Sequence, residues 1–205
     1  MVSTLHFSVA TSATPRQQQQ WCARLVKRRV HITFIVAATL VIGSLVAGVR
    51  PHDLTNVHDV QSWAGVTLVL AGLAIRSWAA GTLHKHTEVT TVGPYALVRH
   101  PLYVGSMLMI VGFCILIGQG GFVWLIAGTF SLLFLAAVNH EERALAAQFG
   151  AAWTNYAAAT PRFIPRRLTA GAGAWSLQQW RRNREYQAVA ATALGLLGLQ
   201  LWQQL

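Results

Sequence analysis

Long apolar runs separated by short polar segments dominate this chain of 205 residues. A helix needs about 20 apolar residues to cross the hydrocarbon core of a bilayer, with roughly 17 as a lower limit. Five runs satisfy or approach this length, near residues 30–49, 57–80, 101–117, 122–139 and 186–202. The pattern predicts an all-α, polytopic transmembrane protein of about five spans, with residues 30–205 forming a single domain. In the alternative four-span version, the last run lies in the membrane interface.

A glycine-rich turn separates the third run from the fourth. No residue from 101 to 139 carries a formal charge, and Gly118-Gln119-Gly120-Gly121 divides this stretch in two. Because consecutive glycines favour turns, we expect a tight helical hairpin here. Beyond the fourth run, apolar residues recur at helical spacing, which predicts one continuous amphipathic helix. These residues are Leu145, Phe149, Trp153 and Tyr156.

The composition and the distribution of charge fit a membrane protein. Hydrophobic residues make up 54% of the chain and charged residues only 11%, against about a quarter charged in soluble domains. The net charge is +10, and fourteen of the 16 Lys and Arg residues fall in the segments 1–29, 81–100 and 140–185. Five spans place these segments on one side, which the positive-inside rule predicts to be cytoplasmic. The basic residues therefore indicate contact with membrane lipids and no nucleic-acid partner.

Residues 1–29 precede the first apolar run. Ser, Thr and Gln dominate residues 1–20, which lack the basic-then-apolar pattern of a signal peptide, and we interpret them as a disordered tail. The rest of this segment combines basic residues with Trp21, as in a basic interfacial segment at the membrane surface. Cys22 lies in this basic segment and Cys114 lies in an apolar run, so we expect no disulfide.

The segment Gly93–Gly105, with the sequence GPYALVRHPLYVG, places a cationic turn directly before an apolar run. Pro101 suits the first position of a helix because its missing N–H costs nothing there, which predicts His100 as the cap. Unpaired N–H groups and the positive end of the helix dipole would then face the preceding loop. Arg99, His100 and Tyr103 would cluster at this end, since positions three and four apart share a helix face. This arrangement predicts a site for an anionic or zwitterionic ligand.

Glu141 and Glu142 lie where the fourth run would leave the bilayer, and they are two of only six acidic residues. Adjacent acids at this depth are costly unless they are solvated or paired. One interpretation is a solvated helix end, or an ion pair with Arg99 or Arg143. The other interpretation is that one carboxylate binds a cationic or hydroxyl-bearing group of a ligand.

Three further polar features are less specific. Arg76, close to the end of its run, either extends to the lipid headgroups or takes part in binding. His84 and His86 form an HxH pair, but no third ligand has a clear spacing, so we predict a solvated loop and no metal site. Arg162 lies between two prolines in a stiff, extended segment, where it contacts a lipid phosphate or a ligand.

Together these residues resemble a known family. GPYALVRHPLYVG, followed after a helical hairpin by HEERALAAQFGAAWTNYAAATPRFIP, is similar to the isoprenylcysteine carboxyl methyltransferase and phospholipid methyltransferase superfamily of integral membrane proteins. The resemblance covers roughly Arg76 to Pro165 and rests on an RHPxYxG motif paired with two acids. It implies S-adenosylmethionine as methyl donor, held in a cytoplasmic pocket between the start of the RHP helix and the end of the helix that carries the acids.

The matched positions imply roles for individual residues. The RHPxYxG residues of the cofactor site are Arg99, His100, Pro101, Tyr103 and Gly105. The residues of the loop that closes around the donor are Gly93, Pro94 and Tyr95. Glu141 and Glu142 match the paired acids that hold polar groups of the donor. Arg162 would orient the acceptor as the catalytic residue, and Arg76 is a second candidate for substrate binding.

The resemblance further implies methyl transfer to a lipidic acceptor, such as the carboxylate of a prenylcysteine-like molecule. Such a reaction asks the protein to align donor and acceptor and to exclude water. A carboxylate needs only orientation, which Arg162 can provide by bidentate pairing. An amine, as in phospholipid N-methylation, would need His140, Glu141 or Glu142 as a base. The alternatives are a membrane reductase with a nicotinamide cofactor and a non-catalytic protein that senses or scaffolds.

Overall fold

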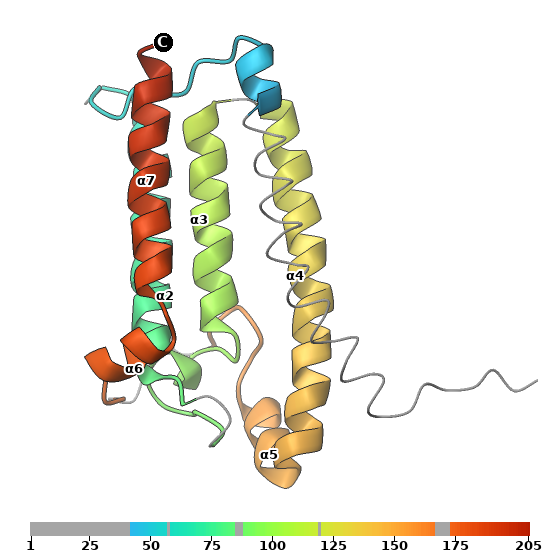
Figure 1. The fold of residues 1–205 in the computed structure, drawn as a ribbon. Coiled ribbons are helices and arrows are strands. Elements are labelled where there is room, and N and C mark those ends of the chain that lie inside the picture. The colour runs from blue at the N-terminus through green and yellow to red at the C-terminus, as the bar shows by residue number, and fades with distance from the viewer. Residues whose placement is uncertain (1–41, 57, 85–87, 119, 167–172) are drawn as a thin grey trace, which may run out of the picture. The chain divides into compact units, whose positions relative to one another are not determined.

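The computed structural model describes residues 42–56, 58–84, 88–118, 120–166 and 173–205, and all regular secondary structure in these ranges is helical. The all-α class is therefore confirmed for this part of the chain. Figure 1 shows the arrangement. The elements are α2 (Val60–Thr82), the 3-10 helix η1 (Gly93–Ala96), α3 (Pro101–Ile117), α4 (Gly120–Phe149), α5 (Ala151–Ala159), α6 (Leu177–Arg182) and α7 (Tyr186–Gln203).

The chain divides into two compact units, Met1–Gly48 and Val49–Leu205. The described part of the first unit is a short helical segment at residues 42–46 and the turn that follows it. The predicted tail and most of the first predicted span lie outside the described residues, as does His86. The second unit contains all the helices named above, and the site is built within it.

Four predicted spans overlap helices of the second unit, namely α2, α3, α4 and α7. Within the described residues, only α2 is both long enough and apolar enough to cross a membrane. α3 is apolar but shorter. The number of spans and the orientation in the membrane therefore stay predictions. The predicted hairpin turn falls between α3 and α4, where Gly118 closes α3 in the left-handed conformation at φ 80°.

Four glycines bring α2 and α3 unusually close together. Gly72 faces Gly105 and Gly65 faces Gly112, and neither contact leaves room for a side chain. A Cβ on Gly105 would lie 2.5 Å from the carbonyl oxygen of Gly72, and a Cβ on Gly112 would lie 2.7 Å from that of Gly65. Small residues of this kind let helix backbones approach each other directly. The start of α3, with the RHP turn, is thereby fixed against the second half of α2.

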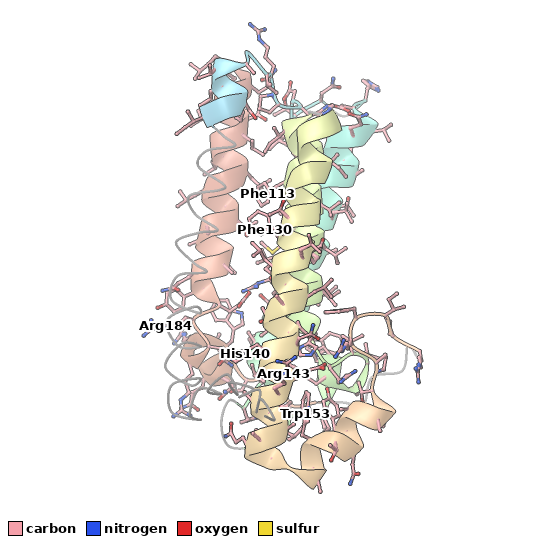
Figure 2. All side chains as sticks on the ribbon, turned by 90° about the vertical axis from the view of Figure 1, so that its right-hand side faces the viewer. Phe113, Phe130, His140, Arg143, Trp153 and Arg184 are labelled. Atoms are coloured by element: carbon pink, nitrogen blue, oxygen red, sulfur yellow. The ribbon has the colours of Figure 1, made fainter. Side chains whose placement is uncertain are left out.

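The apolar core lies between α2, α3 and α7, around Val69, Leu116 and Leu199. Phe113 of α3 packs against this core. Figure 2 shows Phe113 and Phe130 toward one end of the helices, and His140, Arg143 and Trp153 toward the other end. His140 and Arg143 of α4 mark the end of the second unit at which the predicted site residues lie, which we call the site end.

The prediction of one continuous helix from the fourth run through Tyr156 is wrong. α4 ends at Phe149, and α5 begins at Ala151. Gly150 between them adopts φ 54° and ψ −123°, a conformation that residues with a side chain rarely adopt, so the helix breaks there. α5 folds back beside the end of α4 (Figure 1), and it carries the buried Trp153.

The glycine contact between α2 and α3 predicts a selective loss of stability. Gly72→Ala would place a methyl group against the backbone of Gly105 and against Met109, where neither can move far. Overpacking of this kind costs about 1–3 kcal/mol, so the variant should unfold at a lower temperature in detergent. Gly198→Ala is the matched control because an added Cβ there meets nothing within 4 Å. Equal melting temperatures for the two variants would contradict the packing described here.

Candidate active site

The turn before α3 brings the RHP residues to the site end of the second unit. Gly93, the first residue of η1, has φ 61°, which favours glycine, and Pro94 follows it in the same helix. His100 caps α3 and Pro101 occupies its first turn, as the sequence predicted. The His100 side chain is 4% exposed, so it lies inside the protein at the helix end.

Two contacts join this turn to the segment that follows α5. The backbone N–H groups of Arg99 and His100 donate to the carbonyl oxygens of Pro161 and Arg162, at 2.8 and 3.3 Å. The Tyr156 hydroxyl donates to the carbonyl oxygen of Tyr95 at 2.8 Å. These bonds bring Arg162 to the RHP turn, although more than 60 residues separate the two in sequence.

The carboxylate of Glu142 joins the three cationic or imidazole side chains of the site. Its Oε1 atom lies 2.9 Å from Nη1 of Arg99 and 3.0 Å from Nε2 of His100. Arg162 donates through Nε to Oε1 at 3.2 Å and through Nη2 to Oε2 at 2.6 Å. Bidentate, charge-assisted bonds of this type are strong and directional. From the sequence we considered Arg99 or Arg143 as a partner for the acids. Glu142 pairs with Arg99, and it also pairs with Arg162.

The surroundings of Glu142 favour its ionised form. Burial alone would raise the pKa of this carboxyl group. The hydrogen bonds from Arg162 and His100 and the positive charges of Arg99 and Arg162 outweigh burial and hold the pKa below its usual range. Glu142 therefore stays charged at neutral pH and balances the arginines.

Glu141 has a different environment from Glu142. It is exposed, and its Oε2 atom accepts a hydrogen bond from the Tyr103 hydroxyl at 2.9 Å. Across the site, Nε of Arg99 is buried without a hydrogen-bond partner among the described residues. A buried donor left unpaired is costly, which favours a ligand or water at this position. The site thus offers the exposed carboxylate of Glu141 and one unpaired N–H group of the Arg99 guanidinium, at Nε.

The start of α3 is a less open anion site than its sequence predicted. The N–H group of His100 donates to the carbonyl oxygen of Arg162 at 3.3 Å, and the N–H group of Tyr103 donates to the carbonyl oxygen of His100 at 3.1 Å. These donors of the first turn are already in use. The positive character of the site therefore comes mainly from Arg99 and Arg162.

Arg76 lies in a second polar cluster, which the sequence did not reveal. Its Nε and Nη2 atoms donate to the two carboxylate oxygens of Glu185 at 2.8 and 3.0 Å, and Nη1 donates to Oγ of Ser106 at 2.6 Å. Glu185 is 3% exposed and lies between α6 and α7, in a segment without a recognised motif. The only signal for it was an acidic residue directly before an apolar run.

The remaining predicted residues surround these clusters. Gly105 faces the backbone of α2 and the side chain of Arg76, so its small size serves helix packing. Tyr95 is 7% exposed. Its burial, and to a smaller extent the negative charge of Glu141, raise the pKa of its phenol, which therefore stays protonated. Figure 2 shows His140 on α4 beside Arg143. Nδ1 of His84 lies 3.7 Å from Oε1 of Glu88, and both side chains are exposed. No group of three metal-ligating side chains occurs among the described residues.

An apolar groove with a volume of about 360 Å³ lies between α3 and α4. Two of its residues also contact the polar cluster, since Tyr103 bonds Glu141 and the Phe163 ring lies 6.0 Å from that of His100. From Tyr103 the groove follows α3 to Val111, a length of about 12 Å at the helical rise. Its lining residues are Tyr103, Val104, Met107, Leu108, Val111, Ser131, Phe134, Leu135 and Phe163.

Comparison with protein families gives one match that covers much of this region. Residues 60–152 match the family described as phospholipid methyltransferase. The matched residues include the RHP turn and both acids, whereas Arg162 and Glu185 lie beyond them. No solved structure shows significant similarity to the chain.

Three curated protein sequences are similar to the chain. The cobalt-zinc-cadmium resistance protein CzcN of Cupriavidus metallidurans is 31% identical over 86% of this chain and 81% of its own length. The nickel-cobalt-cadmium resistance protein NccN of Alcaligenes xylosoxydans xylosoxydans is 31% identical over 69% of this chain and 67% of its own. The protein-S-isoprenylcysteine O-methyltransferase of Schizosaccharomyces pombe is 27% identical over 70% and 56%, respectively.

The lowered pKa of Glu142 predicts acid-sensitive stability. A carboxyl group with a depressed folded-state pKa stabilises the protein fully above its unfolded pKa, about 4.3, and this contribution disappears as the pH falls through the folded value. Glu142→Gln should therefore be less stable than the wild type at neutral pH, and the difference should shrink on acidification below about pH 5. Thermal melting of both proteins across this pH range measures the effect.

Glu88→Gln is the matched control for that series, because Glu88 is an exposed carboxylate outside the cluster. It should follow the wild type at every pH. A stability difference between Glu142→Gln and the wild type that stays constant from neutral to acidic pH would contradict the role of the ionised carboxylate.

Proposed function

The chain belongs to the superfamily of phospholipid and isoprenylcysteine methyltransferases, and from this premise we propose that it is an S-adenosylmethionine-dependent methyltransferase with a lipidic acceptor. One observation carries the proposal: a polar cluster with charges of both signs adjoins an apolar groove, and Tyr103 and Phe163 contact both. A reaction between a zwitterionic donor and an amphiphilic acceptor needs these two environments side by side.

The residues of the polar cluster fit the donor. S-adenosylmethionine presents a carboxylate, an ammonium group, a ribose diol and a sulfonium, and when bound it supplies an activated methyl group. The unpartnered Nε of Arg99 suits the carboxylate, and the exposed Glu141 suits the ammonium or the diol. Glu142 is already paired on both oxygens, so we assign it to holding Arg99, His100 and Arg162 in place.

The apolar groove fits the hydrocarbon chain of the acceptor. Arg162 and Phe163 are neighbours in sequence, and Phe163 lines the groove. An acceptor whose headgroup binds Arg162 could therefore extend its hydrocarbon chain past Phe163 into the groove. A volume of about 360 Å³ falls within the range of small-molecule sites, about 300–1,000 Å³. The groove therefore supports an acceptor with one apolar chain and one polar reacting end.

Arg162 favours a carboxylate as the reacting end. Its Nε and Nη2 atoms bond Glu142, while 45% of its side chain is exposed, so its outer edge faces away from the cluster. A carboxylate is already ionised at neutral pH and needs only orientation by such a group. Phospholipid N-methylation is the alternative, and it would require Glu141 or His140 to accept the proton of the amine. Arg76 is held by Glu185 and Ser106, which makes it a weaker candidate for acceptor binding.

We place the protein in the membrane with the polar cluster on the cytoplasmic side. The family and the apolar α2 support membrane association, and the distribution of basic residues supports the orientation. A lipidic acceptor could then reach the groove directly from the bilayer. The names of two relatives describe resistance to metals and specify no reaction, so they do not distinguish between acceptors.

Binding of S-adenosylhomocysteine tests the donor site. Calorimetric titration of the detergent-purified wild type should give saturable binding, and NADPH should give none. Glu141→Gln should weaken binding about tenfold to a hundredfold, since a hydrogen bond to a charged group contributes about 1.5–3 kcal/mol. Glu88→Gln should bind like the wild type. Saturable binding of NADPH without binding of S-adenosylhomocysteine would replace this proposal with a nicotinamide-dependent reductase.

Filling the far end of the groove tests the acceptor site. Val111→Trp should raise KM for acceptors with long chains, such as farnesyl or hexadecyl derivatives, while acceptors with octyl chains react as before. Its affinity for S-adenosylhomocysteine should not change, because Val111 lies about 12 Å along α3 from Tyr103. Leu132→Trp is the matched control, since Leu132 is 70% exposed on α4 and does not line the groove. An equal effect on all chain lengths would place the acceptor elsewhere.

A further inference from the structure

The segment 173–183, which we name the C-terminal strap, lies across the end of α2 and against the turn that leads to the active site. It comprises α6 and the residues just before it, and α6 lies beside the end of α2 in Figure 1. No motif marks this segment, and it lies beyond the residues matched by the family. Its contacts nevertheless connect it to the proposed donor site.

Polar groups of the strap pair with carbonyl oxygens in the last turns of α2. The N–H group of Ser176 donates to Gly81 at 3.0 Å, and Nδ2 of Asn183 donates to Ala80 at 2.7 Å and to Leu83 at 3.0 Å. The side-chain amide of Gln179 also donates to Leu83. The last carbonyl groups of a helix have no partner within the helix and need one elsewhere. The strap is therefore the C-terminal cap of α2.

Two tryptophans fix the position of the strap. Nε1 of Trp175 donates to the carbonyl oxygen of Ser77 at 3.0 Å, and Nε1 of Trp180 donates to its hydroxyl at 3.2 Å. The indole of Trp175 lies directly on Gly81, where an added Cβ would overlap the ring. The position of the strap along α2 is thus defined by contacts that only a glycine at position 81 allows.

Gly93, the first residue of η1, is enclosed between α2 and the strap. On one side a Cβ at Gly93 would lie 3.1 Å from Cγ2 of Thr82. On the other side a Cβ at Gly173 would lie 2.8 Å from the backbone nitrogen of Gly93. Contacts on both sides therefore set the position of Gly93. Its φ of 61° also favours glycine, so a residue with a side chain would be strained there.

From these contacts we propose that the C-terminal strap positions the Gly93–Ala96 turn for donor binding, with Gly173 and Trp175 as positioning residues. The strap touches Gly93, Gly93 begins the turn that carries Tyr95, and the turn leads directly to Arg99 and His100. A shift of the strap would therefore displace the loop that closes around the donor, while α4 and the groove keep their contacts. The proposal rests on the proposed function for the identity of the donor.

Hydrogen exchange and donor binding together test this proposal. In Gly173→Ala and Trp175→Ala, the amides of residues 92–98 should exchange at least tenfold faster than in the wild type, whereas those of α7 should not change. The affinity for S-adenosylhomocysteine should fall about tenfold, with KM for the acceptor unchanged. Trp175→Phe keeps an aromatic ring but loses the hydrogen bond to Ser77, so it should lie between the wild type and Trp175→Ala. Gly198→Ala is the matched control, because an added Cβ at Gly198 has no neighbour within 4 Å.

The outcomes separate this proposal from the proposed function. Wild-type exchange and wild-type affinity in both Gly173→Ala and Trp175→Ala would overturn the strap proposal and leave the methyltransferase intact. Faster exchange without any loss of affinity would also overturn it, because the turn would then move without affecting the donor. A wild type that does not bind S-adenosylhomocysteine would overturn the proposed function and the role of the strap in donor binding together.

Discussion

The carboxylate of Glu142 is the interaction on which the arrangement of the site depends. It holds Arg99, His100 and Arg162, which come from two segments far apart in sequence, and both of its oxygens are used. Two arginines brought this close would repel each other without an anion between them. Removing one partner of a partly buried ion pair leaves the other charge uncompensated. The resulting loss of stability is usually larger than the stability that the intact pair contributes. Glu142 thus acts on the site through its neighbours, and Glu141 remains accessible to a ligand.

Helix packing decides where this cluster lies. The glycine contacts fix the start of α3 against α2, and the break at Gly150 turns α5 back so that the segment with Arg162 reaches the RHP turn. The groove between α3 and α4 then begins where the polar cluster ends. Under the proposed function, a charged donor and an apolar acceptor chain would therefore meet at one point, each in a favourable environment.

Much of this arrangement follows from sequence patterns that act locally. The apolar runs predicted the positions of α2, α3, α4 and α7, and the proline after His100 predicted the cap of α3. Other features depend on partners that no local pattern specifies. The break after Phe149 required recognising that Gly150 adopts a positive φ, because the apolar spacing continues across it. The pair of Arg76 with Glu185 joins residues 109 positions apart, and the strap pairs with carbonyl groups that have no sequence signature.

The most direct test of this account is transfer of a radiolabelled methyl group from S-adenosylmethionine by the purified protein, with a farnesylcysteine derivative and membrane lipids as acceptors. The account predicts label in an organic-soluble product, formed faster with the farnesylated carboxylate than with an acceptor of the same headgroup that lacks the chain. Label that appears only in water-soluble acceptors, or no transfer to any acceptor despite saturable binding of S-adenosylhomocysteine, would contradict the assignment of a lipidic methyltransferase.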